Sequence, residues 1–192
     1  MTTTVEQEII DANLDPWTPI PTYVSRFRDL ISTATLGQVE AASVWYFDAQ
    51  EVAEDVAEIL GVDLERGASI VSAFSPRERW ASNVAKAYAF ANGKPVTGLT
   101  NNLKMAQDAL DLGFDALKGL KTNAFARAIS GDTNAVVIDV WMMRAAKMVT
   151  DSPNKGQYRQ LSEAVTTVAD EFGITPRTAQ ALIWIIVRGS AS

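Results

Sequence analysis

The chain has 192 residues, of which 47% are hydrophobic, so it is long enough to bury a substantial core. It contains no Cys and no His, which excludes disulfides, thiolate nucleophiles and histidine-based zinc or general-base chemistry. The longest apolar run, 182–187, is too short to span a bilayer, and the N-terminus lacks a signal-peptide pattern. We expect a cytoplasmic protein with no cofactor, no metal and no membrane association.

The net charge of −6 is unevenly distributed along the chain. Residues 1–66 carry 3 basic and 13 acidic side chains, whereas residues 67–155 carry 11 basic and 7 acidic ones. Binding to nucleic acid depends on local potential more than on net charge. The basic middle segment therefore leaves DNA open as a partner, although ordinary scatter of surface charge explains the same counts.

The spacing of apolar residues, glycines and prolines predicts helices almost throughout, about ten in all. In chain order they are expected at 4–14, 22–34, 38–60, 64–74, 76–92, 99–112, 114–118, from 121 to the turn at 131, 140–149, 156–172 and 176–188. The only β-like run, 135–138, is too short and isolated to build a sheet. The fold class is therefore predicted to be all-α.

Several side chains have expected places in these helices. In 38–60, the large apolar residues recur at steps of three and four and predict a buried stripe, with a solvated acidic face beside it; the stripe consists of Val44, Phe47, Val52, Val56, Ile59 and Leu60. Ser75 is expected to cap the helix that follows it, with Pro76 in the first turn. Trp80, Trp141 and Trp184 are expected in the core. Trp17 is expected to anchor the N-terminal arm.

Three segments in order, 70–77, 98–106 and 117–124, resemble the helix-hairpin-helix DNA glycosylases, the endonuclease III-like superfamily. They are followed by 136–140, which is similar to the aspartate turn of that superfamily. The resemblance covers about residues 64–150. It implies one two-lobed helical domain, 1–192, with 64–150 as its motif-bearing core and 1–60 and 156–190 as flanking helices.

A narrower resemblance points to phage-encoded relatives of this superfamily, similar to the thymine-hypermodification proteins. It rests on 75–77, 131–133, 139–141 and the C-terminal segment 180–189. It implies a protein that acts on an altered base in DNA instead of excising damage.

The resemblance assigns roles to Lys121 and Asp139, which stand eighteen residues apart. Asp139 aligns with the carboxylate that stabilises positive charge on the sugar. Lys121 aligns with the amine that forms a Schiff base in the bifunctional glycosylases. Trp141 would form a pocket wall.

Further residues are implied to bind DNA. Arg77 is placed like the side chain that fills the gap left by an everted base. The hairpin would hold a phosphate near the N-terminus of a helix, through Lys118, Gly119, Thr122 and Asn123.

The sequence also departs from the superfamily. Its hairpin is shorter and keeps one glycine, Gly119, and Trp141 stands where His is usual. Asp139 suits an N-cap as well as a functional carboxylate, and Lys121 and Arg77 suit exposed positions in first helical turns.

Three hypotheses about function therefore stay open. The chain is an enzyme that acts on a base or base modification in DNA, a DNA-binding module of this fold without catalysis, or a protein-interaction factor that uses its acidic first 66 residues. The sequence does not fix the oligomeric state or whether catalysis is retained.

Overall fold

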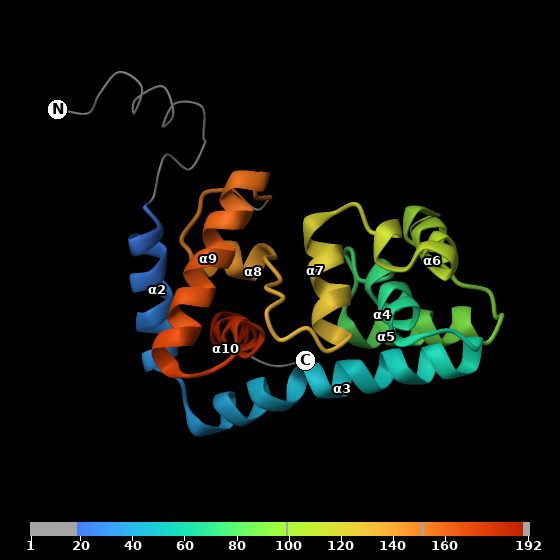
Figure 1. The fold of residues 1–192 in the computed structure, drawn as a ribbon, viewed down its shortest axis with the longest axis horizontal. Coiled ribbons are helices and arrows are strands. Elements are labelled where there is room, and N and C mark those ends of the chain that lie inside the picture. Colours follow the sequence, from blue (N-terminus) through green and yellow to red (C-terminus); the bar gives the residue numbers. More distant parts are fainter. Residues whose placement is uncertain (1–18, 99, 151, 190–192) are drawn as a thin grey trace, which may run out of the picture. The chain divides into compact units, whose positions relative to one another are not determined.

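A computed structural model describes residues 19–98, 100–150 and 152–189, and that part of the chain is all-helical (Figure 1). It contains nine α-helices, one 3-10 helix and no strand. The helices are α2 (Ile20–Ser32), α3 (Leu36–Leu60), α4 (Leu64–Ala73), α5 (Trp80–Ala91), α6 (Thr100–Leu112), η1 (Gly113–Ala116), α7 (Leu120–Ile129), α8 (Val140–Ala145), α9 (Lys155–Phe172) and α10 (Pro176–Arg188). The all-α prediction is confirmed for these residues, while the expected helix 4–14 and Trp17 lie outside them. No described helix combines the length and apolar character that a membrane span requires.

The chain divides into two compact units. Unit 1 consists of the described residues within 1–43 and 138–191, and unit 2 of those within 44–137. Helix α3 begins in unit 1 and ends in unit 2. The expected core 64–150 thus covers unit 2 from α4 onward and continues through α8 of unit 1.

Unit 1 packs α2, α8, α9 and α10 around one core. Helix α2 buries Tyr23, Phe27 and Ile31, which lie one turn apart on the same face. Helix α2 contacts α9, which buries Leu161. The regular spacing of large side chains explains why both helices form and why these faces become buried.

The ends of α9 and α10 follow local signals in the sequence. Asn154 caps α9 reciprocally with Gln157, and Gly173 ends it in the left-handed conformation at φ 65°. Thr175 caps α10 by accepting a hydrogen bond from the backbone N–H of Thr178, and Pro176 occupies the first turn. The predicted boundary between these helices is confirmed.

Unit 2 is built around α4. All residues from Gly67 to Ala73 are buried, and α4 contacts α5, α6, α7 and η1. Helix α3 approaches so closely that a Cβ atom at Gly67 would lie 2.3 Å from the carbonyl oxygen of Ala53. The absence of a side chain at Gly67 is therefore a requirement of this packing.

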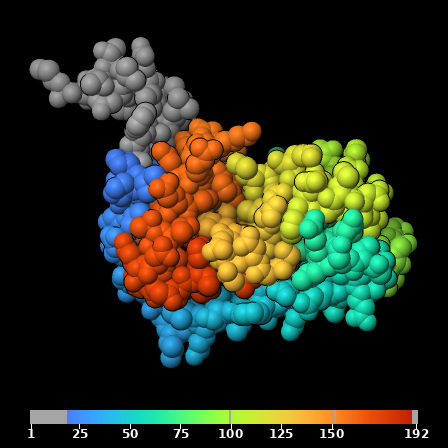
Figure 2. Space-filling view, in the orientation of Figure 1, coloured from blue at the N-terminus to red at the C-terminus, as the bar shows by residue number. Residues whose placement is uncertain are grey.

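The predicted stripe on α3 is only partly correct: Val56 is fully buried as predicted, but three other members are exposed. Val44, Phe47 and Ile59 are 51%, 59% and 45% exposed, whereas Ala49 and Ala53 are fully or almost fully buried. Small side chains allow the close approach of α4, so the buried face of α3 is rich in alanine, while Val44, Phe47 and Ile59 lie outside it. In the space-filling view α3 lies at the surface (Figure 2). The acidic residues of α3 are exposed, as predicted.

The helix expected from Pro76 begins at Trp80 instead. The backbone N–H of Glu78 donates to the carbonyl of Ser75, which closes a turn, and Arg77 adopts φ 62°. Glu78 then accepts hydrogen bonds from Lys86 and Ser82 of α5. Ser75 is not the cap, and its hydroxyl is buried without a partner among the described residues.

Two further expectations need correction. Trp80 is half-buried and not in the core, with its ring 5.6 Å from that of Trp45 and 6.2 Å from that of Phe125. Helix α8 ends at Ala145 before the expected end near 149, and Lys147 follows in a left-handed conformation at φ 56°. That conformation cannot continue a right-handed helix.

Replacing Gly67 by Ala should destabilise the protein, because the added methyl would overlap Ala53 and Ala57 of α3. We expect a loss of about 1–3 kcal/mol in the free energy of unfolding, measured in urea. Gly37→Ala is the matched control, since no described atom lies within 4 Å of its new methyl. Equal stabilities of the two variants would contradict the close packing of α3 and α4.

Candidate nucleic-acid interface

The hairpin between α6 and α7 consists of η1 and residues 117–119. Gly119 occupies the N-cap of α7 with extended backbone angles, and no described side chain caps this helix. Lys118, Gly119 and Lys121 are exposed. A helix N-terminus without a side-chain cap, flanked by two lysines, is suited to an anion such as a phosphate.

Thr122 and Asn123 point into the hairpin. The Thr122 hydroxyl donates to the Gly119 carbonyl at 3.0 Å. The Asn123 amide donates to the carbonyls of Phe114 and Leu117 at 3.0 and 3.3 Å. These side chains hold the shape of the loop, and their predicted contact with nucleic acid stays a prediction.

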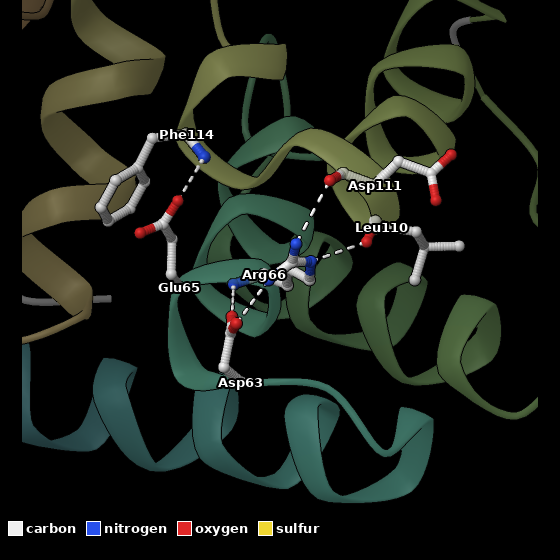
Figure 3. A network of polar contacts seen from close by, with 6 residues as sticks. All are labelled: Asp63, Glu65, Arg66, Leu110, Asp111 and Phe114. Atoms are coloured by element: carbon white, nitrogen blue, oxygen red, sulfur yellow. Dashed lines mark hydrogen bonds and ion pairs between the residues drawn. The ribbon is translucent and has the colours of Figure 1, made fainter.

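The first half of the hairpin is fixed by the N-terminal end of α4 (Figure 3). Arg66 donates from Nε to the Leu110 carbonyl at 2.8 Å and from Nη2 to the Asp111 carbonyl at 3.2 Å. These bonds satisfy carbonyl groups in the last turn of α6, which lack partners within the helix. Glu65 accepts the backbone N–H of Phe114 at 3.2 Å, so one short stretch of α4 holds both α6 and η1.

The C-terminal end of α4 binds the second half of the hairpin. The Ser72 hydroxyl donates to the Thr122 carbonyl at 2.7 Å. Just beyond, the Pro76 carbonyl accepts a hydrogen bond from Asn102 at 3.2 Å. The turn that carries Arg77 and the start of α7 are therefore both attached to the same end of α4.

The basic side chains of unit 2 fall into two groups. Arg66, Lys86 and Lys104 form ion pairs with Asp63, Glu78 and Asp108. Glu78 has its pKa lowered by its hydrogen bonds from Lys86 and Ser82.

The other six are exposed and make no ion pair within the described residues: Arg77, Arg79, Lys94, Lys118, Lys121 and Arg127. Three of them, Arg77, Lys118 and Lys121, are the residues that the sequence predicts to bind DNA. Two carboxylates lie nearby in the chain: Asp115 in η1, and Glu78, which is paired with Lys86. The positive charge of these three side chains therefore remains available to a phosphate.

Asp139 lies in unit 1, where it caps α8. Its Oδ1 accepts the backbone N–H groups of Trp141 and Met142 at 2.9 and 3.1 Å. Its Oδ2 accepts the indole N–H of Trp184 on α10 at 3.0 Å. Both oxygens of the half-buried carboxylate are thus engaged, and the predicted N-cap role is confirmed.

Tyr158 on α9 completes the surroundings of Asp139. Its hydroxyl accepts the backbone N–H of Ile138 at 3.2 Å. Burial raises the pKa of Tyr158 to about 12, and the charge of Asp139 acts in the same direction. The phenol therefore stays neutral at physiological pH and satisfies an amide that is itself buried.

The predicted site residues are thus divided between the units. Arg77, Lys118 and Lys121 belong to unit 2, whereas Asp139 and Trp141 belong to unit 1. Each is placed within its own unit, and the meeting of Lys121 with Asp139 stays a prediction.

Sequence reasoning missed Tyr158 and the pairing of Trp184 with Asp139. The partner of the indole is 45 residues away in the chain, and no local pattern indicates such a contact. Trp141 and Trp184, expected in the core, are half-buried. The guanidinium of Arg144 lies 4.5 Å from the ring centre of Trp141.

Comparison with known protein families matches residues 16–191 to a family of unknown function (DUF7178). No curated protein and no solved structure matches the chain.

Replacing Asp139 by Ala should remove the cap of α8 and leave the Trp184 N–H without its acceptor. We expect a loss of about 2–4 kcal/mol in the free energy of unfolding. Asp139→Asn keeps an oxygen for the cap and should lose roughly half as much. Asp170→Asn, at an exposed position of α9, is the control. If Asp139→Ala unfolds at the same urea concentration as this control, the carboxylate is not a structural cap.

Proposed function

We propose that this chain, which belongs to the DUF7178 family, binds DNA through the hairpin and the adjacent turn of unit 2. The observation that carries the proposal is the group formed by Arg77, Lys118 and Lys121. These side chains are exposed and make no ion pair within the described residues. They come from the turn after α4 and from the start of α7 with the residues before it, and hydrogen bonds attach the start of α7 to the C-terminal end of α4.

The physical basis is neutralisation of phosphates. Each lysine or arginine that replaces condensed counterions on DNA contributes affinity without regard to base sequence. The start of α7 adds the favourable end of a helix dipole. The net charge of the chain is negative, so the binding depends on this local group and weakens steeply with salt.

A binding role has more direct support than a catalytic one. Both oxygens of Asp139 already accept hydrogen bonds from N–H donors. Before this carboxylate can contact a sugar, it has to lose one of these hydrogen bonds, most simply the one from the Trp184 indole.

Base chemistry is the second candidate. The observation in its favour is a half-buried carboxylate that accepts the indole N–H of Trp184 and acts on a neutral phenol, Tyr158, because partial burial weakens the screening of its charge. In this proposal Asp139 stabilises the positive charge that develops on deoxyribose, and Lys121 supplies an amine, as the resemblance to the helix-hairpin-helix glycosylases implies. A role on a modified base, as in the phage thymine-hypermodification proteins, would use the same residues.

Replacing both Lys118 and Lys121 by Gln should weaken binding to a labelled DNA duplex. Two lost phosphate contacts should flatten the dependence of log affinity on log salt concentration by about 1.8. The measurement is fluorescence anisotropy over a series of salt concentrations.

The matched control is Lys94→Gln. Lys94 is exposed but follows the C-terminal end of α5, at the other end of that helix from the Arg77 turn. It should leave the salt dependence unchanged. If the control and the double variant change the salt dependence equally, the hairpin is not the DNA contact. If the wild-type protein binds no duplex at low salt, protein interaction through the acidic first 66 residues becomes the leading hypothesis.

The catalytic candidate predicts covalent capture. The protein is incubated with duplexes that carry uracil, 5-hydroxymethyluracil or an abasic site, in the presence of borohydride. Capture should disappear in Lys121→Gln, and base release should fall by about a hundredfold in Asp139→Asn. No adduct and no base release from any of these duplexes would leave the binding role alone.

A further inference from the structure

Two tryptophan–arginine pairs of unit 1 are linked through one carboxylate. Arg144 covers Trp141 on α8, with 4.5 Å between its Cζ atom and the ring centre. Arg188 covers Trp184 on α10 in the same way, at 4.6 Å. The Asp139 carboxylate binds the backbone N–H of Trp141 and the indole N–H of Trp184, so it brings the two pairs together.

The charge of this cluster is not neutralised by neighbouring acids. Arg144 and Lys147 are exposed and Arg188 is half-buried, and none of them forms an ion pair within the described residues. Asp139, five residues before Arg144 in the chain, is engaged by N–H donors. The surface therefore combines planar cations, aromatic rings and positive charge.

We propose that this surface binds single-stranded nucleic acid, with unpaired bases stacked on the guanidinium groups of Arg144 and Arg188. A guanidinium supported by an indole is held in position and offers its other face to a base, while its N–H groups reach phosphate. Such alternation of stacking planes with cations is typical of proteins that bind single strands without sequence preference. The surface uses none of the residues proposed above for the duplex.

An acidic peptide or an anionic membrane would also be attracted by the charge, but neither needs a stacking plane. The flat support of both guanidinium groups is the feature that favours bases. Lysine substitution separates these cases, because lysine keeps the charge and lacks the plane.

The test uses the full chain and two fluorescent oligonucleotides of equal length and charge. One is oligothymidylate, and the other carries abasic tetrahydrofuran units in place of every nucleoside. The wild-type protein should bind oligothymidylate about tenfold more tightly, because only this strand can stack. In the Arg144→Lys, Arg188→Lys double variant the preference should disappear, while affinity for the abasic strand is retained.

Arg159→Lys, at an exposed position of α9, is the matched control and should keep the preference. Thermal unfolding of each variant shows whether the fold is intact, and the single Arg144→Lys variant repeats the test if the double variant unfolds. Equal affinity of wild-type protein for the two strands, or a preference that survives both substitutions, would overturn the proposal. Binding of polyglutamate or phosphatidylserine vesicles that requires these arginines, without any preference for bases, would overturn it as well.

The duplex proposal and the single-strand proposal can be rejected independently of each other. Lys118→Gln, Lys121→Gln should lose duplex affinity and keep the preference for oligothymidylate over the abasic strand. If duplex affinity is unchanged in that variant while the arginine substitutions abolish the preference, the duplex contact is wrong and the single-strand surface stands.

Discussion

Unit 2 depends on how the buried helix α4 is held to the hairpin that follows α6. Arg66 and Glu65 bind backbone groups at the end of α6 and the start of η1, and Ser72 binds the backbone of α7. These bonds satisfy helix-end groups that would otherwise lack partners. All three contacts end on backbone atoms of the hairpin and its flanking helices. The side chains of Lys118 and Lys121 therefore remain exposed while the backbone near them is held in place.

Unit 1 is organised in an analogous way by a single carboxylate. Asp139 ends an irregular segment, begins α8 and ties it to α10 through Trp184. A capping aspartate uses one carboxylate oxygen for the backbone N–H groups of its helix, so the second oxygen can accept a hydrogen bond from another side chain. Here the partner is the indole of Trp184, and the guanidinium groups of Arg144 and Arg188 lie over the rings of Trp141 and Trp184.

The ion pairs of unit 2 divide its basic side chains into those neutralised by a carboxylate and those free to attract an anion. Lys86 is paired with Glu78, and its Nζ atom would lie 2.8 Å from a Cβ atom at Gly98. Lys118 and Lys121 have no such partner among the described residues. A negatively charged chain can therefore present local positive potential, because pairing removes some cations from the surface field and leaves others.

The sequence by itself determined the all-α class and those helix ends that depend on local chemistry, such as the end of α9 before Gly173 and the Asp139 cap. It also indicated that Lys121 is exposed, since this follows from its position in a first helical turn. Only the tertiary structure decided which face of α3 is buried and where the indole of Trp184 points. The physical reason is that caps and stops are satisfied within a few residues, whereas close packing at Gly67 and a bond across 45 residues depend on neighbours that no local pattern specifies.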